Sequence, residues 1–343
     1  MTSPGRNGGR PTLETVAARA GVSKSLVSLV LRDSPKVSPA SREAVRQAVA
    51  ELGYRPNAAA RLLAERRSRT VGVLLNDIRQ PWFADMLDGL TPVLHADGKH
   101  ILLGDGRIDR MMDETLTWSF FELGVDGLVL AGSIPLSGAI IGIASKIPTV
   151  AVGGRGLGLD LPHVDVLAND NHLGGALAVR HLIEFGHTQI AHISGLPSVA
   201  GRLRMQAYED TMRAEGLGGR VLIEAGDMSE EGGYRATARL LSRPDRPTAI
   251  FAANDLTCVG ALSAATALGV RVPGELSLVG FDNSVFARLR ALWLTSVDGS
   301  ARAMGQQAAR TLLARIEHPG APATTELMPP RLEVRGSTAP LRP

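Results

Sequence analysis

Three things are scarce in this sequence of 343 residues, and each scarcity excludes a class of protein. The single cysteine, Cys258, rules out an intrachain disulfide and suits a reducing compartment. No run approaches 18 consecutive apolar residues, so we expect no membrane-spanning helix. The opening residues MTSPGRNGGRP are basic but lead into no apolar stretch, so we expect no secretory signal. The sequence therefore predicts a cytoplasmic protein that makes no membrane contact.

Motifs that carry catalytic chemistry are also missing. The sequence has no G-x-x-x-x-G-K-[ST] phosphate loop, no G-x-S-x-G serine-hydrolase motif and no H-E-x-x-H zinc motif. The glycine cluster GGRGLG at 153–158 lacks dinucleotide-binding spacing. The histidines that lie closest together, His181, His187 and His192, are interpreted as helix-surface and turn residues, and Cys258 as a packing residue. We therefore predict no catalytic residue, no cofactor and no metal site.

Charge is distributed unevenly along the chain. Residues 1–69 hold 13 Lys and Arg against 5 Asp and Glu, a net charge of +8, whereas the remaining residues carry a net charge of −5. A small basic segment on a mildly acidic body favours contact with a polyanion. A solvated basic tail is the alternative interpretation.

Three short helical patterns lie in this basic segment, after a flexible Gly- and Arg-rich tail at residues 1–10. The first pattern begins at Thr12 as N-cap, and the second is capped by Ser23. The third begins at Ser38, followed by a proline suited to the first helical turn, and stops at Gly53.

The second of these helices, within GVSKSLVSLVLR at 21–32, has two distinct faces. At about 100° per residue, one face carries the apolar residues Leu26, Val27, Val30 and Leu31. The other face carries Lys24, Ser25, Ser28 and, unexpectedly, Leu29. Two helices joined by a brief turn form a helix-turn-helix pattern, in which the second helix enters the DNA major groove. A three-helix bundle that binds no DNA is the alternative, and the basic charge favours DNA.

From Thr70 onward, short β-branched runs alternate with helical segments. The predicted strands are 71–75, 100–104, 127–131, 149–152, 189–194, 249–253 and 276–280, and the helices between them include 83–97, 172–185, 202–214, 232–242 and 256–268. This alternation is typical of doubly wound parallel sheets with helices on both faces. A break near 167–170 divides the segment into two lobes, and strand ends converge on the cleft between them, where such sheets bind ligands.

Several runs of the chain resemble LacI/GalR-type transcription repressors. The resemblance begins with TLETVAARAGVSKSLVSLVLRDSPKVSPASREAVRQAVAELGYRPNAAARLLA and continues through VGVLLNDIRQPWFADMLDGL, DNHLGGALAVRHLIEFGHTQIAHISG, GRLRMQAY, FAANDLTCVGAL and VPGELSLVGFDN. It extends from Thr12 to Thr338, with its motifs in order. It implies an N-terminal all-α helix-turn-helix head joined to an α/β two-lobed core that resembles periplasmic binding proteins.

The resemblance also implies how the chain is divided. The predicted parts are a tail at 1–10, a DNA-binding domain at 11–56, a hinge helix at 57–69 and an effector-binding, dimerising core at 70–338. Within the core we expect a first lobe at about 70–168 plus 298–323 and a second lobe at about 169–297 plus 324–338. The resemblance implies a nucleoid-associated homodimer that binds a pseudo-palindromic operator and responds allosterically to a small effector, of carbohydrate type.

Residues of the head and hinge match positions that contact DNA in the family. Base-reading positions are matched by Lys24, Ser25 and Leu29, and phosphate-contacting positions by Thr12, Ser23 and Ser28. In the hinge, the leucine that wedges into the minor groove is matched by Leu63 and its neighbours by Asn57 and Ala60. Many relatives have arginine at the Leu29 position. Leucine cannot hydrogen-bond guanine, so we predict an operator without a strong guanine preference there.

Residues of the core match positions that bind the effector in the family. They are Asp77, Trp82, Phe83, Arg204, Asn254, Asp255 and Asp282. Charged and amide groups suit vicinal hydroxyls, and aromatic rings suit the apolar face of a sugar. Two departures argue against a simple hexose. Met228 replaces a stacking tryptophan of sugar-responsive relatives, and Gly153 replaces a sugar-binding aspartate.

Two further function classes share parts of this pattern. A solute-binding protein has the same two-lobed core but predicts a secretion signal and no basic head. A metabolic enzyme using the cleft requires a nucleophile, a base or a cofactor loop, and detectable turnover of a bound sugar or nucleoside would reveal one.

Overall fold

The computed structural model describes residues 11–31, 33–54, 68–106, 110–134, 137–153 and 163–341. The chain divides into two compact units, Met1–Ser68 and Arg69–Pro343, and each is described by itself. The predicted tail and most of the predicted hinge helix lie outside the described residues, as do the hinge residues Asn57, Ala60 and Leu63.

The described residues of the N-terminal unit form three helices. They are α1 (Leu13–Ala20), α2 (Lys24–Leu31) and α3 (Pro39–Leu52). The predicted caps are confirmed: Thr12 and Ser38 accept hydrogen bonds from the first turns of α1 and α3, and Ser23 Oγ accepts from Leu26 N at 3.2 Å. Gly53 ends α3 with φ 60°, a left-handed conformation that glycine adopts without steric cost.

A small core holds these helices together. Val16, Val27 and Val45 are fully buried in it, one from each helix. Leu31, predicted on the apolar face of α2, is instead 36% exposed, and it is the last residue of that helix. α2 is therefore fixed through one face and leaves the other to solvent.

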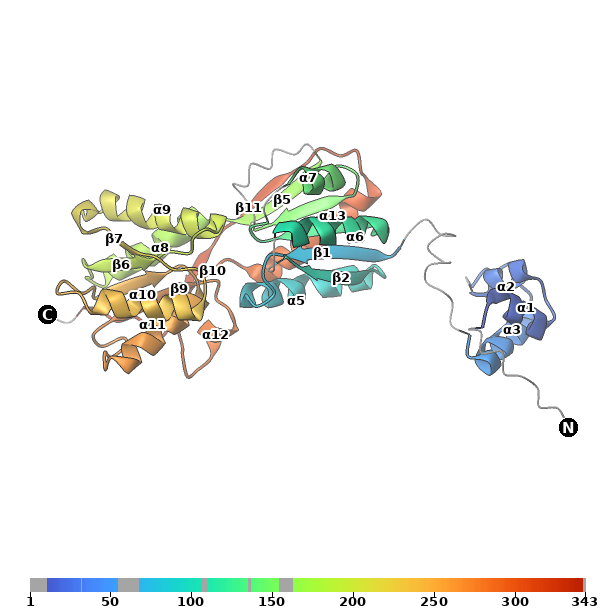
Figure 1. Ribbon diagram of the computed structural model, residues 1–343, viewed down its shortest axis with the longest axis horizontal. Coiled ribbons are helices and arrows are strands. Elements are labelled where there is room, and N and C mark those ends of the chain that lie inside the picture. Colours follow the sequence, from blue (N-terminus) through green and yellow to red (C-terminus); the bar gives the residue numbers. More distant parts are fainter. Residues whose placement is uncertain are drawn as a thin grey trace. The chain divides into compact units, whose positions relative to one another are not determined.

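The C-terminal unit contains two six-stranded sheets, each with its helices (Figure 1). In order, the first sheet is β11 (Thr325–Met328), β5 (Val164–Asn169), β4 (Thr149–Val152), β3 (Gly127–Ala131), β1 (Thr70–Leu75) and β2 (His100–Asp105). The second is β12 (Arg331–Glu333), β10 (Thr295–Asp298), β9 (Ser277–Phe281), β8 (Ala249–Ala252), β6 (Ile190–Ile193) and β7 (Leu222–Glu224). All neighbouring strands are parallel except β12, which pairs antiparallel with β10.

Helices cover both faces of each sheet, as expected for doubly wound parallel sheets (Figure 1). The first lobe has α5 (Pro81–Ala96), α6 (Arg110–Glu122), α7 (Gly138–Ala144) and α13 (Ala301–Glu317). The second has α8 (Asn171–Glu184), α9 (Val199–Ala214), α10 (Glu230–Leu241), α11 (Asp255–Ala267) and α12 (Val285–Arg288). The apolar clusters between sheet and helices are fully buried, for example Val71 with Leu90 and Ile250 with Ala261.

The chain passes between the lobes three times. The first crossover leaves β5 for α8, and the second leaves β10 for α13. The predicted placement of 324–338 in the second lobe is wrong in its first part: β11 pairs with β5, with Thr325 opposite Val166, so the third crossover comes at Pro329 and Pro330.

The three histidines predicted at helix surfaces and turns are buried instead. His181 bonds Thr338, and His187 bonds Ser277, each at 3.0 Å. His192 Nδ1 donates to the Phe251 carbonyl at 2.9 Å. The prediction fails because each ring finds its partner on a segment distant in sequence.

His192 predicts a measurable dependence of stability on pH. Burial lowers the pKa of this imidazole to about 3, whereas an unfolded histidine titrates near 6.5, so the unfolded chain binds the extra proton below about pH 6.5. We expect the stability advantage of the parent over His192→Asn, which retains a donor but does not titrate, to shrink by about 2 kcal/mol between pH 7 and pH 5. Urea unfolding at both pH values measures this, and a constant difference contradicts it.

Candidate functional site

The exposed face of α2 is the candidate DNA-binding surface. Lys24, Ser25 and Leu29 lie on it, and Leu29 is 37% exposed. Thr12 is exposed at the start of α1, Ser23 is exposed just before α2, and both hydroxyl oxygens accept cap hydrogen bonds. These hydroxyl groups retain a hydrogen that can be donated to a phosphate oxygen.

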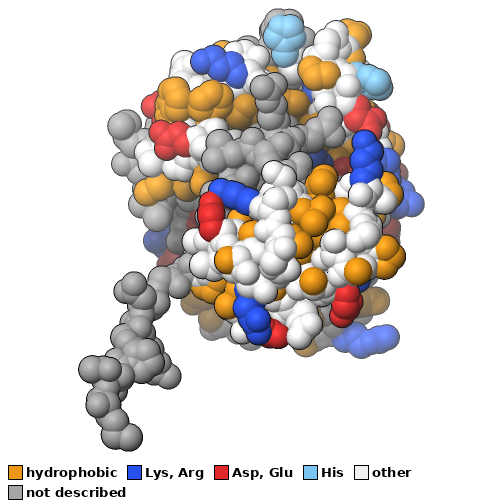
Figure 2. All heavy atoms as spheres, turned by 90° about the vertical axis from the view of Figure 1, so that its right-hand side faces the viewer, with side chains coloured by type: hydrophobic (Ala, Val, Ile, Leu, Met, Phe, Trp, Pro, Cys, Tyr) orange, Lys and Arg blue, Asp and Glu red, His pale blue; other side chains and the backbone are white. Residues whose placement is uncertain are grey.

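Basic groups of the head are partly paired with acids. Lys24 bonds Glu14, and this contact lowers the pKa of the Glu14 carboxyl to about 2. Both side chains are more than half exposed, so the pair is weak in water. On the face of the molecule in Figure 2, several Lys and Arg side chains lie beside Asp or Glu side chains. Lys24 can therefore exchange Glu14 for a base or a phosphate at little cost.

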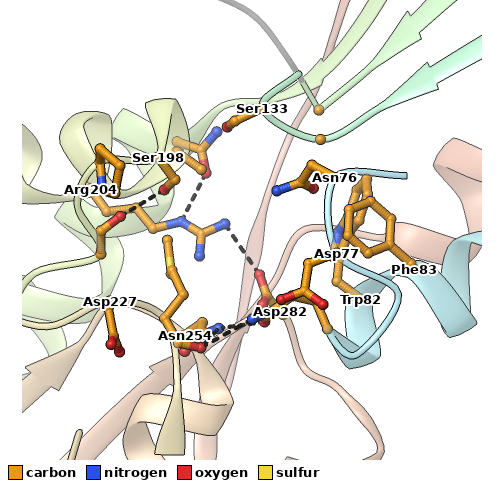
Figure 3. A pocket seen from close by; sticks show the side chains of 18 of the residues that line it. Asn76, Asp77, Trp82, Phe83, Ser133, Ser198, Arg204, Asp227, Asn254 and Asp282 are labelled. Carbon is orange, nitrogen blue, oxygen red and sulfur yellow. Dashed lines mark hydrogen bonds and ion pairs between the residues drawn. The ribbon is translucent and has the colours of Figure 1, made fainter. Parts of the chain in front are cut away.

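A cavity of about 380 Å³ lies where the carboxyl ends of both sheets meet. It is lined by Asn76, Asp77, Gln80, Trp82, Phe83, Gly132, Ser133, Gly153, Asn169, Asn171, Gly195, Leu196, Pro197, Ser198, Ala200, Arg204, Asp227, Met228, Asn254 and Asp282. Figure 3 shows Asp77 and Trp82 of the first lobe across from Arg204 and Asp282 of the second. The carboxyl ends of parallel strands are where α/β sheets bind ligands.

Arg204, from α9, is the most connected side chain in this cavity. Its three guanidinium nitrogens donate to Asn171 Oδ1 at 2.9 Å, the Ala253 carbonyl at 2.7 Å and Asp282 Oδ1 at 3.2 Å. The guanidinium also lies 3.5 Å from the centre of the Phe281 ring. The arginine is only 4% exposed, so its position is fixed before any ligand arrives.

Asp282 meets Arg204 from the turn after β9. Its φ of 101° is rare for a residue other than glycine, and such strain is concentrated at functional sites. Burial raises the pKa of the Asp282 carboxyl to about 6, although the Arg204 guanidinium opposes the shift. The pair presents adjacent hydrogen-bond donors and acceptors to the cavity.

The first lobe contributes aromatic surface. Trp82 and Phe83 form an edge-to-face pair with ring centres 5.1 Å apart. Phe83 is 3% exposed and belongs mainly to the lobe's core, whereas Trp82 is half-buried at the cavity wall. A Cβ at Gly153 would lie 3.3 Å from the Trp82 ring, so a larger residue at this position would crowd the indole.

The buried amide of Asn254 joins the two lobes at the cavity. Asn254 Nδ2 donates to Gln80 Oε1 at 3.1 Å and to the Met228 carbonyl at 3.2 Å. Asn254 Oδ1 caps α11 by accepting from Thr257 N. Asp77 holds Arg79 through two hydrogen bonds of 2.9 and 2.8 Å. The predicted residues Asp77 and Asn254 thus line the cavity with their polar groups already engaged.

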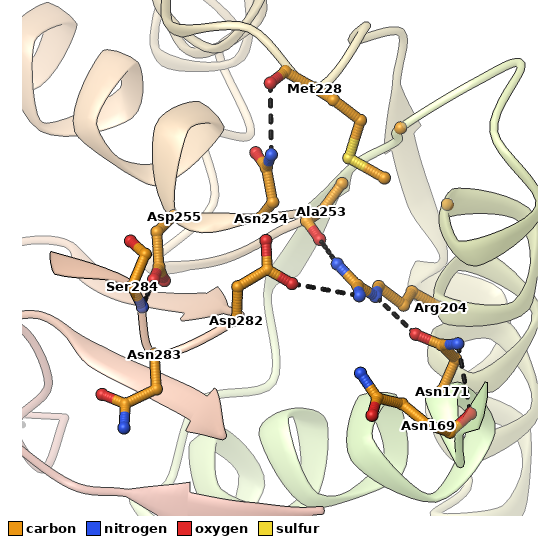
Figure 4. Close-up of polar contacts among 12 residues, drawn as sticks. Asn169, Asn171, Arg204, Met228, Ala253, Asn254, Asp255, Asp282, Asn283 and Ser284 are labelled. Carbon is orange, nitrogen blue, oxygen red and sulfur yellow. Dashed lines mark hydrogen bonds and ion pairs between the residues drawn. The ribbon is translucent and has the colours of Figure 1, made fainter. Parts of the chain in front are cut away.

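Asp255 is the predicted effector residue that the structure does not bring to the cavity. Its carboxylate accepts from Ser296 Oγ at 2.6 Å and from Ser284 N at 2.7 Å, behind the β9 turn. Figure 4 shows it on the far side of Asp282 from Arg204. We correct its assignment: Asp255 is the first residue of α11, and it supports the turn that carries Asp282.

Several polar residues of the lining escaped prediction. They are Asn76, Gln80, Ser133, Asn169, Asn171, Ser198 and Asp227. Asn76 directly follows β1 and Ser133 comes shortly after β3, so the strand-end rule, applied to the predicted strands, identifies both. Asn169 is the last residue of β5, and Asp227 comes shortly after β7; neither strand was predicted.

No helix among the described residues is long and apolar enough to cross a membrane. No group of three or more His, Cys, Asp or Glu side chains in that part of the chain is arranged to hold a metal ion.

Comparison with protein families matches both units. Residues 12–57 match bacterial regulatory proteins of the lacI family, and residues 179–338 match a periplasmic binding protein-like domain. The transcriptional regulator CelR of Thermobifida fusca is 38% identical over 317 residues, which cover 90% of this chain and 92% of CelR. The regulator GalR of Escherichia coli K12 is 32% identical over 332 residues, 96% of each chain.

Solved structures agree with these matches. A CelR–cellobiose complex is 35% identical, with a TM-score of 0.71 over 96% of this chain and all of the other. A lac repressor dimer bound to operator and the anti-inducer ONPF is 27% identical, with a TM-score of 0.84 over the same shares. The relatives are regulators rather than enzymes. The chain belongs to the LacI family of DNA-binding transcriptional regulators.

Proposed function

We propose that this regulator is a repressor that binds a two-fold symmetric operator as a homodimer and changes its operator affinity when a carbohydrate enters the cavity. The Arg204–Asp282 pair carries the proposal, because it is a buried, pre-positioned set of donors and acceptors at the meeting point of the two lobes. A ligand held there touches both lobes, so its binding can alter their relative position.

The chemistry of the lining favours a carbohydrate. Amide, carboxylate and guanidinium groups supply donors and acceptors for hydroxyls, and Trp82 supplies an apolar wall. The volume of about 380 Å³ lies in the range of small-ligand sites. The CelR relative was solved with cellobiose, so a β-linked disaccharide is the first probe. Thr12, Ser23, Lys24, Ser25, Ser28 and Leu29 are proposed to contact DNA, in the cytoplasm at the nucleoid.

A thermal-unfolding screen tests the ligand class. Its probes are cellobiose, its α-linked isomer maltose, single hexoses, sugar phosphates and nucleosides. A sugar present at 100 times its Kd is expected to add about 2.7 kcal/mol to the stability of the C-terminal unit. Stabilisation by nucleosides alone contradicts the carbohydrate assignment.

Operator selection tests the DNA side. Full-length protein and random duplexes at moderate salt are expected to yield a site with two-fold symmetry, because paired heads bind two half-sites. Adding the sugar found in the screen then shows whether operator affinity changes. If no symmetric site is enriched, the proposal that a homodimer binds a two-fold symmetric operator is wrong.

A further inference from the structure

Among the described residues that line the cavity, only Asn169 carries a buried side-chain polar atom without a hydrogen-bond partner. It is the last residue of β5, where the first crossover begins, and it is 5% exposed. Among the described residues, its Oδ1 has no hydrogen-bond partner. Burying an amide oxygen without a partner costs folding free energy, so a chain that tolerates it usually gains something elsewhere.

The neighbouring amides are fully engaged, which sets Asn169 apart. Asn171 accepts from Arg204 with its Oδ1 and donates to the Asn169 main-chain carbonyl with its Nδ2. Asn254 uses both ends of its amide, on Gln80 and on the cap of α11. Figure 4 shows the Asn169 carboxamide beside Asn171, and the hydrogen bond drawn to Asn169 ends on its main chain rather than on its carboxamide.

Asn169 also contacts the second crossover. A Cβ built on Gly299 would lie 2.3 Å from Asn169 Nδ2 and 2.8 Å from its Cγ. Only glycine at position 299 leaves room for the Asn169 amide in its present position. Asn169 therefore lies between two of the segments that must move if the lobes change their relative position.

We propose that Asn169 is a ligand-contacting residue whose carboxamide hydrogen-bonds a hydroxyl of the bound carbohydrate, and that this contact lets the ligand act on two crossovers at once. The inference rests on the proposed carbohydrate function. A hydroxyl suits the site because it both donates and accepts, and a half-turn of the amide about its last torsion exchanges oxygen and nitrogen. Either end can therefore face the ligand.

The first test compares Asn169→Ala with its parent, using the sugar identified by the screen. We expect 10- to 100-fold weaker binding by calorimetry, the cost of one hydrogen bond to a buried group. The unliganded variant is expected to unfold at or above the parent's midpoint, because an unpaired polar group has been removed. Thr237→Val is the matched control: Thr237 is also buried with an unpartnered oxygen, but it lies on α10 outside the cavity, so sugar affinity is expected to stay unchanged.

A second test separates contact from a general disturbance of the crossover. Gly299→Ala displaces the Asn169 amide and is expected to weaken sugar binding in the parent, yet to have no further effect in the Asn169→Ala background. A monodeoxy sugar lacking the contacted hydroxyl is expected to bind the parent and the alanine variant equally. The proposal is overturned if the losses of sugar affinity caused by Gly299→Ala and Asn169→Ala add up in the double variant. It is also overturned if Asn169→Ala weakens the binding of every monodeoxy sugar, because Asn169 then has a structural role.

The outcomes also separate this inference from the proposed function. If a sugar stabilises the parent and binds Asn169→Ala with equal affinity, the Asn169 proposal is wrong and the carbohydrate function stands. If no sugar in the panel binds the parent, both are wrong.

Discussion

Replacing Arg204 by methionine is expected to abolish sugar binding and to destabilise the second lobe. Methionine keeps an apolar stem over Phe281 but removes the donors to Asn171, the Ala253 carbonyl and Asp282. Asp282 is then a buried carboxylate without its cation, and breaking a buried pair costs about 3–5 kcal/mol. Calorimetry with the sugar and urea unfolding measure the two effects.

Two further variants separate binding from stability. Arg204→Met combined with Asp282→Asn removes the orphaned charge, so stability is expected to recover while sugar binding does not. Arg213→Ala is the matched control on α9: that arginine is exposed and pairs with Glu209 and Asp210, none of which lines the cavity. A sugar-induced shift that survives Arg204→Met shows that this arginine does not bind the ligand.

Leu29→Arg is expected to change which base pair the operator requires. Leucine offers no hydrogen bond, whereas arginine can bond guanine O6 and N7 together, which discriminates by about 1–3 kcal/mol per contact. Operators selected by the variant should therefore gain a guanine at one position of each half-site, where operators of the parent show no strong guanine preference. Parallel selections with both proteins measure this.

Leu31→Arg is the matched control for this change. Leu31 is 36% exposed, as Leu29 is at 37%, but at about 100° per residue it lies about 200° around α2 from Leu29. The same added charge at this position is expected to raise affinity for all DNA without changing base preference. If the parent's operators already carry an invariant guanine at the base pair opposite Leu29, the assignment of Leu29 is wrong.

Local features of the fold were predictable because their causes are local. The caps at Thr12, Ser38 and Gly53 depend on hydrogen bonds within four residues, and the structure contains them as predicted. The predicted strands of the two lobes occur within a residue or two, because strands buried on both faces appear as unbroken apolar runs. β5, β7, β10, β11 and β12 were not predicted. β7 and β12 are three-residue edge strands that are only partly buried, whereas β5 has six residues and is fully buried.

The candidate cavity was predictable only in part. Arg204 and Asp282 follow from the family resemblance, and the structure brings them within 3.2 Å of each other. Asn254 and Asp255 are adjacent in sequence and equally polar, yet one lines the cavity and the other lies behind the β9 turn. Which of the two reaches the cavity depends on Ser284 and Ser296, some thirty and forty residues away.

The sequence by itself determined the class of this protein: a helix-turn-helix head, a two-lobed α/β core and the LacI family, because order, spacing and periodicity of motifs are properties of the chain alone. Only the tertiary structure decided which polar groups meet. In that structure His192 is buried and donates to the Phe251 carbonyl, and β11 pairs with β5 in the first sheet. The Oδ1 of Asn169 has no hydrogen-bond partner among the described residues. The physical reason is that a polar group's burial and partners are set by segments far away in sequence, which meet only when the strand ends converge.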